Sequence, residues 1–284
     1  MEKTAIAFGT FDGLHLGHIA VLKDILGTNL KPVALSFSVP PKYNKNADGN
    51  LIMTLKEKEK AFFNLGITPI FMDFNKVKDI SPTDFLEKVL KKYSPCLIST
   101  GYDFRFGKNA SGDCKLMKQF LKEHNIIYKM TPPVSLSGQP VSSSKIRNEI
   151  SLGNMEQVSK MLGRPFSFEN KVIRGDQRGR TIGFPTINQA YPKELVLPKL
   201  GVYESVTEFK GRKYKSITNI GHRPTYLTDK VLAETYIFDF NGDIYGENAK
   251  VGFIKFLREE KKFNSLQELK NAIEADKNLL INKF

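Results

Sequence analysis

The segment T-A-I-A-F-G-T-F-D-G-L-H-L-G-H, residues 4–18, decides the fold of the first half of the chain. An apolar run leads through glycines and histidines into I-A-V-L-K-D-I-L, whose spacing predicts a helix. Backbone N–H groups at a helix start attract anions, and Gly13 and Gly17 allow a close approach. We expect phosphate to bind at this turn, where His15 and His18 are suited to stabilise charge on a transferring phosphoryl group. Alone, the H-x-G-H pattern is weak evidence for phosphate binding, and a helix-capping role for these residues explains it equally well.

The residues that follow repeat this alternation of apolar runs and amphipathic stretches. The runs that read as strands are P-V-A-L-S-F, P-I-F-M-D-F and C-L-I-S-T. Those that read as helices are L-K-E-K-E-K-A-F-F-N-L-G and D-F-L-E-K-V-L-K-K-Y. Strands separated by helices of about ten residues predict a parallel sheet covered on both faces. Ligands of such sheets bind at the carboxyl ends of the strands.

From residue 165 the pattern changes to β-branched and aromatic runs, among them F-S-F-E-N-K-V-I, V-Y-E-S-V-T-E-F and A-E-T-Y-I-F-D-F. Gly, Asn-Gly and Pro punctuate these runs, which predicts antiparallel strands in a small barrel. The chain closes with S-L-Q-E-L-K-N-A-I-E-A-D-K-N-L-L, which reads as a helix. We therefore expect two domains, residues 1–162 and 163–284.

Size and charge fit this division. The 284 residues are 40% hydrophobic and 26% charged, an ordinary globular composition with enough chain for two cores. The net charge of +13 divides into +7 for residues 1–150 and +6 for residues 151–284, with no basic tail or arm. A nucleic-acid-binding or regulatory protein would cluster its basic residues, so local phosphate-binding spots are the better explanation.

The two cysteines, Cys96 and Cys114, form no C-x-x-C pair and lie at no metal-ligand spacing, so we expect structural thiols. The N-terminus lacks the apolar core of a signal peptide, and no stretch approaches about 18 apolar residues. We expect a cytoplasmic protein without membrane or nucleic-acid partners.

A second motif, V-S-S-S-K-I-R at residues 141–147, opens another predicted helix and ends in an arginine suited to clamp phosphates. Together the two motifs resemble those of the nucleotidyltransferase superfamily. G-T-F-D-G-L-H-L-G-H, G-Y-D-F-R-F-G-K-N-A-S-G-D and P-V-S-S-S-K-I-R-N-E-I are similar to bacterial FAD synthetases.

This resemblance implies a Rossmann-like domain that binds ATP and FMN, in which the FMN phosphate attacks the α-phosphorus and pyrophosphate leaves. Magnesium shares the phosphate charge. The residues it assigns are His15 and His18 for catalysis, Gly9, Gly17, Ser143, Ser144 and Arg147 for ATP phosphates, and Asp103 and Phe104 for flavin or nucleotide.

One segment departs from the family. Many members carry His-Pro after the second strand, whereas Ser-Val-Pro-Pro-Lys stands here at residues 38–42. Lys42 offers a replacement for the phosphate contact, but a proline-stiffened loop is the favoured interpretation.

The stretch N-K-V-I-R-G-D-Q-R-G-R-T-I-G-F-P-T-I-N, residues 170–188, contains neither a Walker A pattern nor G-x-G-x-x-G. By itself it predicts a positively charged loop with a hydroxyl and an amide able to coordinate magnesium or phosphate, or a structural hairpin. It also resembles the glycine-rich flap and G-[FI]-P-T-A-N of riboflavin kinases, with Ile187 in place of alanine. Further segments that resemble this family follow in the same order along the chain, namely G-V-Y, N-I-G-H-R-P-T and F-I-K-F-L-R-E-E-K-K-F.

The kinase resemblance implies a six-stranded antiparallel barrel with a terminal helix. It assigns Glu234 as the catalytic base, Gly175 and Gly183 to ATP, Thr186 and Asn188 to ATP and Mg²⁺, and Arg258 to the flavin or the flap. Without the resemblance, Glu234 reads as an ordinary outward-facing strand residue. A charged surface position explains Arg258 nearly as well as a contact with the flavin or the flap. His222 is assigned no role.

Over the whole chain the resemblance is to bifunctional riboflavin kinase/FAD synthetases, which convert riboflavin to FMN and then FMN to FAD, each step with ATP and Mg²⁺. The nearest alternative is a riboflavin kinase with weak or lost adenylyltransferase activity. Adenylation of a pantetheine or nicotinate phosphate also explains the first two motifs but leaves the second domain unexplained.

Overall fold

The computed structural model describes residues 2–43, 48–175, 183–225, 228–261 and 265–281. The chain forms two compact units, one of residues 1–47 and 53–145 and one of residues 48–52 and 146–284. The segment 48–52 belongs to the second unit because Leu51 forms a parallel bridge with Leu195.

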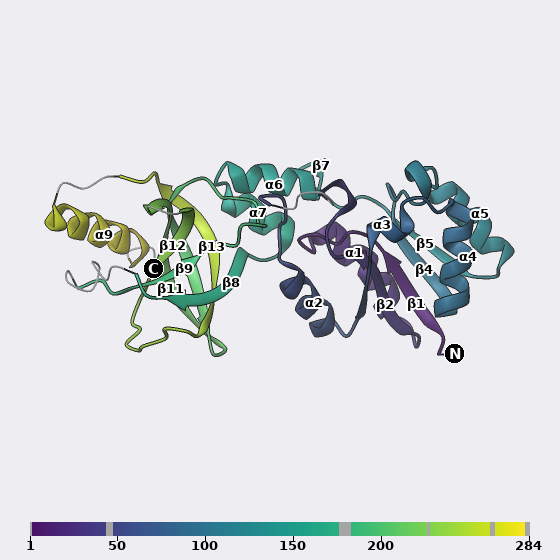
Figure 1. The fold of residues 1–284 in the computed structure, drawn as a ribbon, viewed down its shortest axis with the longest axis horizontal. Helices are drawn as coiled ribbons and strands as arrows, with labels where there is room; N and C mark the ends of the chain where they lie inside the picture. The colour runs from purple at the N-terminus through teal and green to yellow at the C-terminus, as the bar shows by residue number, and fades with distance from the viewer. Residues whose placement is uncertain (1, 44–47, 176–182, 226–227, 262–264, 282–284) are drawn as a thin grey trace. The chain divides into compact units, whose positions relative to one another are not determined.

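The first unit is built on a five-stranded parallel sheet of order β3-β2-β1-β4-β5 (Figure 1). Its strands are β1 Thr4–Phe8, β2 Lys31–Phe37, β3 Thr68–Met72, β4 Pro95–Gly101 and β5 Ile127–Thr131. Its helices are α1 Leu16–Leu26, α2 Leu55–Asn64, α3 Phe74–Val77, α4 Pro82–Tyr93 and α5 Cys114–Glu123, with 3-10 turns at Pro41–Tyr43 and Lys108–Ala110. The predicted α/β class and parallel sheet are confirmed.

Alternate residues of the buried strands face opposite layers of helix. Ala5 and Ala7 pack with Leu22 and Ile25 of α1, whereas Ile6 lies in a separate cluster with side chains of α4 and α5. This period of two explains why the strands read as continuously apolar. Because both faces are covered, access to the sheet is confined to its edges and to the ends of its strands.

Short elements follow the parallel sheet. A small hairpin, β6 Ser135–Leu136 and β7 Gln139–Pro140, leads to helices α6 Ser143–Ser151 and α7 Met155–Leu162. Helix α7 contacts β8 and β13 of the following barrel. The apolar residues that predicted this helix, Met155, Val158, Met161 and Leu162, are all buried.

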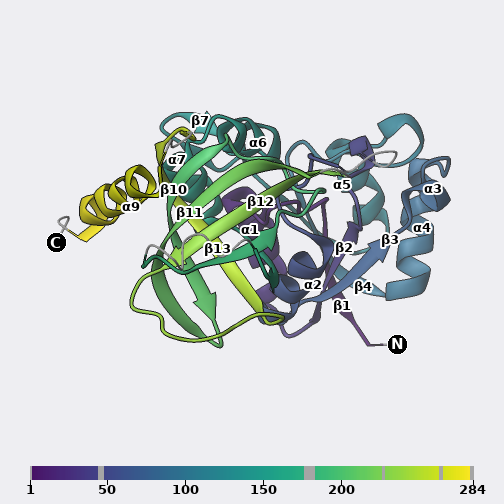
Figure 2. The ribbon, with the colours of Figure 1, turned by 60° about the vertical axis from the view of Figure 1, so that its left-hand side comes forward.

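Six antiparallel strands close into a barrel in the order β10-β11-β12-β9-β8-β13 (Figure 2). They are β8 Phe166–Ile173, β9 Thr186–Ala190, β10 Gly201–Phe209, β11 Arg212–Thr225, β12 Thr228–Ile237 and β13 Asn248–Arg258, followed by helix α9 Leu266–Ile281. The predicted barrel and terminal helix are confirmed. On β12, Ala233, Thr235 and Ile237 are buried, so the intervening Glu234 and Tyr236 point outward.

No helix among the described residues is long and apolar enough to cross a membrane.

Candidate functional site

The turn after β1 has an unusual backbone. Phe11, Gly13 and Leu14 have φ angles of 50°, 80° and 42°, in the left-handed region that costs energy for residues other than glycine. The turn ends at His15, the N-cap of α1, whose Nδ1 accepts the N–H of His18 at 3.3 Å. A ring nitrogen that accepts is unprotonated, so in the neutral ring the hydrogen sits on Nε2. Nδ1 then caps the helix while Nε2–H is a donor for a phosphate oxygen, so the capping and phosphate-binding interpretations of His15 are compatible.

His15 and His18 form a stacked pair with ring centroids 3.6 Å apart and planes within 17°. The Phe11 ring meets His18 edge-on at 5.4 Å and fixes it from another side. Gly17 leaves room for this pair, because a Cβ at that position would lie 3.1 Å from the His15 ring and would press against it. The H-x-G-H spacing thus packs two imidazoles together at the first turn of one helix.

A cavity of about 560 Å³ opens at the carboxyl ends of β1 and β4. This is the location expected for a ligand of a parallel sheet. It brings together eight of the predicted residues: Gly9, His15, Gly17, His18, Asp103, Phe104, Ser143 and Ser144.

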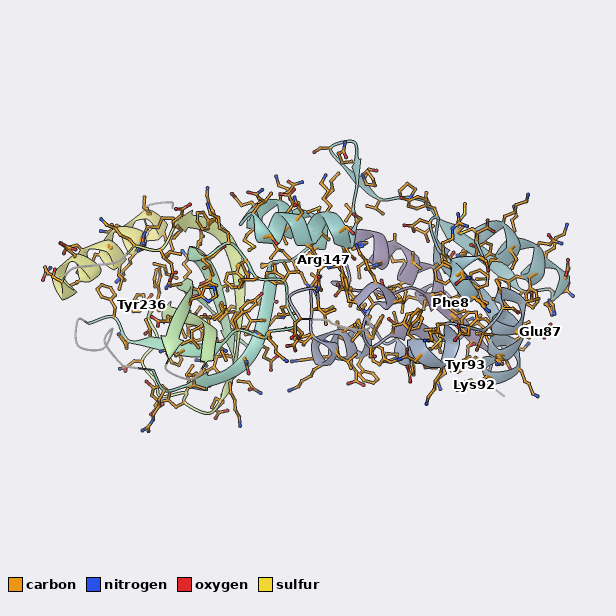
Figure 3. All side chains as sticks on the ribbon, turned by 45° about the horizontal axis from the view of Figure 1, so that its top comes forward. Phe8, Glu87, Lys92, Tyr93, Arg147 and Tyr236 are labelled. Carbon is orange, nitrogen blue, oxygen red and sulfur yellow. The ribbon has the colours of Figure 1, made fainter. Side chains whose placement is uncertain are left out.

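The second predicted motif reaches this cavity through the start of α6. Ser143 Oγ donates to the Asp12 carbonyl at 3.1 Å, which ties α6 to the turn after β1. Arg147, one turn further along α6 (Figure 3), is not among the residues that line the cavity. Its Nε donates to the carbonyl of Asn50.

Aromatic rings form one wall of the cavity. Phe104 stacks on Phe8 at 5.6 Å and on Phe106 at 5.6 Å, and Phe85 lies 5.9 Å from both Phe8 and Phe106. Phe8 marks this wall in Figure 3. Such a wall suits a planar aromatic ligand. Of these four, the sequence motif identified Phe104 alone, although the alternation F-R-F points to Phe106 as well.

The segment that replaces His-Pro contributes Pro41 to the cavity lining, but Lys42 is absent from that lining. Lys42 is exposed, and its Nζ lies 5.5 Å from the centre of its neighbour's ring, Tyr43. The arrangement favours the proline-stiffened loop over a phosphate contact by Lys42.

The barrel carries a second cavity, of about 130 Å³, on its outer face beside α9. Thr186, Glu234 and Arg258, which the sequence placed in one site, all line it. Asn219, Tyr236 and Asp276 line it too and were not singled out from the sequence. Tyr236 is labelled on the barrel in Figure 3.

Asn188 lies directly beside this cavity. It is paired with Glu234 across β9 and β12, and Glu234 is paired with Asn219 across β12 and β11. Side chains at paired positions share a face of the sheet, so these three form a polar row. Asn188 is 5% exposed, and its Oδ1 has no hydrogen-bond partner among the residues that the structure describes.

Glycine is required where the predicted flap leaves the barrel. A Cβ on Gly175 would lie 2.5 Å from Asn188 Nδ2, and Gly183 has a φ of 87°. Gly179, Arg178 and Arg180 of the predicted flap lie outside the described part of the chain. The third arginine, Arg174, is described, and its guanidinium lies 5.5 Å from the centre of the Tyr245 ring.

Arg258 is held by the terminal helix. Its Nε donates to both carboxylate oxygens of Asp276, at 3.1 and 3.2 Å, and its second guanidinium nitrogen donates to Oδ2 at 2.8 Å. Asp276 is buried and Arg258 is 31% exposed. This ion pair fixes one wall of the barrel cavity.

Two family models match the chain. Residues 1–145 match FAD synthetase, and residues 162–284 match riboflavin kinase. Each compact unit therefore contains one of the two cavities together with most of one family match.

Curated relatives match nearly the whole chain. The bifunctional riboflavin kinase/FMN adenylyltransferase of Bacillus subtilis is 33% identical and covers 99% of this chain and 93% of its own length. The protein of the same name from Escherichia coli is 30% identical, and the match covers 97% of this chain and 91% of that protein. A solved structure described as a macrolide-efflux protein from Streptococcus pneumoniae is 27% identical, with a TM-score of 0.89 over 100% of this chain and 96% of that one.

Proposed function

Since the chain belongs to the family of bifunctional riboflavin kinase/FMN adenylyltransferases, we propose that its barrel cavity phosphorylates riboflavin and its sheet cavity adenylylates the FMN so formed. The enzyme combines a riboflavin kinase and an FAD synthetase in one polypeptide. The observation that carries the assignment is that eight motif residues of the first domain line one cavity, whereas Thr186, Glu234 and Arg258 of the second line another.

In the barrel, Glu234 is the general base. Its carboxylate accepts the proton of the riboflavin 5′-hydroxyl as that oxygen attacks the γ-phosphorus of ATP and ADP leaves. The polar row from Asn188 to Asn219 places it between two amides that orient substrate oxygens. Arg258, fixed by Asp276, closes the flavin side of the same cavity.

Oxygen atoms at the barrel site fit Mg²⁺. The buried Asn188 Oδ1 offers an acceptor, and the Thr186 hydroxyl and Glu234 carboxylate stand on the same face. Hard oxygen donors are the ligands that Mg²⁺ prefers, with ATP phosphates completing its shell. We assign Thr186 and Asn188 to hold the metal, which neutralises phosphate charge when bound, and Gly175 and Gly183 to let the flap approach ATP.

In the sheet cavity a phosphate oxygen of FMN attacks the α-phosphorus of ATP, and the bond to the β-phosphate breaks to release pyrophosphate. His15 and His18 stabilise the charge on the α-phosphoryl group. Ser143, Ser144 and the start of α1 at Gly17 receive the phosphates, and the aromatic wall with Phe104 stacks on a planar ring. We propose that Arg147 contributes by securing α6 through Asn50 or by turning toward ATP when it binds.

Three further parts of the proposal come from the sequence. We place the functional boundary between residues 162 and 163, although contacts divide the chain at 145 and 146. We also propose a cytoplasmic location, and the small molecules riboflavin, FMN and ATP as partners, without nucleic acid or membrane.

Separate assays of the two reactions test the function. Riboflavin with MgATP should yield FMN and ADP, and FMN with MgATP should yield FAD and pyrophosphate. A chain that phosphorylates riboflavin but makes no FAD from supplied FMN would establish the monofunctional alternative. Chelation of Mg²⁺ should stop both reactions, and its restoration should recover them.

A further inference from the structure

The first domain buries a lysine that none of the motifs includes. Lys58 of α2 is 3% exposed, and its Nζ donates to the carbonyls of Phe37 at 2.7 Å and Thr10 at 3.1 Å. The ammonium also lies 5.4 Å from the centre of the Phe71 ring. One charged group thus joins the ends of β1 and β2 and contacts β3.

Both carbonyls border the catalytic cavity. Thr10 and Phe37 line it, and Thr10 begins the strained turn that leads to His15. Phe37 immediately precedes the segment that lacks the family's His-Pro. Ser36 Oγ donates to the same Thr10 carbonyl at 3.0 Å, so two buried donors converge on this point.

A turn with residues in the left-handed region persists only when its surroundings hold it. Ser143 holds the Asp12 carbonyl, and Lys58 and Ser36 hold that of Thr10. We propose that Lys58 is a positioning residue of the adenylyltransferase site, whose ammonium fixes the turn that carries His15 and His18.

Burial lowers the pKa of Lys58 from 10.5 to about 8, against the opposing effect of Asp12. The ammonium interacts with Asp12 of the β1–α1 turn. Ser36 of β2, which shares the Thr10 carbonyl with it, and Phe71 of β3 are uncharged. Deprotonation near pH 8 weakens both charge-assisted hydrogen bonds. The positioning effect should therefore fade as the pH rises through about 8.

The free energy of unfolding should rise over the pH range in which this positioning effect fades. Between about pH 8 and 10.5 the unfolded chain keeps a proton on Lys58 that the folded protein has lost. Where the unfolded state binds more protons, the free energy of unfolding rises with pH. An alkaline loss of activity caused by this lysine is thus separable from unfolding.

The experiment measures FAD formation from FMN and MgATP between pH 6 and 10 in the full chain, together with thermal unfolding. At pH 7, Lys58→Met should lower kcat about tenfold or more, with a smaller change in KM for FMN. Lys58→Arg keeps its charge and should lose the decline near pH 8 that the wild type shows. Lys56→Met, an exposed lysine of the same helix, is the matched control and should behave as the wild type does.

Ser36→Ala provides a second route, because it removes one donor from Thr10 and leaves the charge in place. It should lower kcat severalfold and keep the decline near pH 8. The inference is overturned if Lys58→Met stays within twofold of the wild type, or if folded Lys58→Arg declines as the wild type does. Should both Lys58 variants unfold, an unchanged kcat for Ser36→Ala overturns it. The inference rests on the adenylyltransferase reaction, and wild-type FAD formation at pH 7 tests that reaction separately.

Discussion

Asn188 of β9 and Glu234 of β12 are direct partners in the antiparallel register of the barrel, and their side chains share its outer face. The pairing places an amide oxygen with no partner among the described residues beside a carboxylate that lines the kinase cavity. The proposed base, Glu234, and the proposed metal ligand, Asn188, thus stand side by side on two paired strands of the barrel.

Replacement of Glu234 by Gln should lower riboflavin phosphorylation about 100- to 10,000-fold, because the amide cannot accept the hydroxyl proton. FAD formation from supplied FMN should be unchanged, since the other cavity is intact. Chromatography of the flavins after each assay measures both rates. Glu208→Gln, on β10 and outside both cavities, is the control. Equal loss of both activities in a folded Glu234→Gln protein would contradict the assignment.

His18→Ala should have the opposite effect. Loss of the imidazole removes a hydrogen-bond donor for the α-phosphoryl charge, and we expect FAD formation to fall about 100- to 1,000-fold while FMN formation continues. Pyrophosphate release from FMN and ATP measures the loss. His124→Ala, at the end of α5, removes an imidazole that binds the Phe120 carbonyl, and it should leave both rates near wild type. If His18→Ala makes FAD at the normal rate, the stacked histidines are not catalytic.

Asp276→Asn tests the wall that α9 adds to the kinase cavity. The change removes the charge that holds Arg258, and we expect a loss of about 1–3 kcal/mol of stability, moderated by the partial exposure of the guanidinium. The KM for riboflavin should rise more than kcat falls, and FAD synthesis from FMN should not change. Glu274→Gln, an exposed position of α9 that pairs with Lys270, controls for charge on the helix. An unaltered riboflavin KM would show that Arg258 does not act through this pair.

Much of this architecture was predictable from local pattern. Continuous apolar strands separated by amphipathic helices gave the parallel sheet, and alternation around Glu234 gave its outward position on the barrel. The glycines at 17 and 175 were recognised by motif, and their structural reasons are contacts with His15 and Asn188. These features could be predicted because the periods of strands and helices can be read from a few neighbouring residues.

Residues fixed by tertiary contacts escaped prediction. Lys58 stands in L-K-E-K-E-K-A-F-F, where every lysine fits a solvated helix face, and only the packing of α2 on β2 and β3 buries it. The partner of Arg258 lies 18 residues further along the chain, and nothing local identifies it. The division of contacts near residue 145 depends in the same way on which unit α6 and α7 pack against.

Incubation of the pure chain with riboflavin and MgATP alone, followed by chromatography of the flavins over time, tests most directly that one polypeptide carries both reactions. FMN should appear first and FAD should then accumulate as FMN is consumed, with ADP and pyrophosphate as the second products. FMN that accumulates without FAD, at saturating MgATP and neutral pH, would contradict the bifunctional assignment.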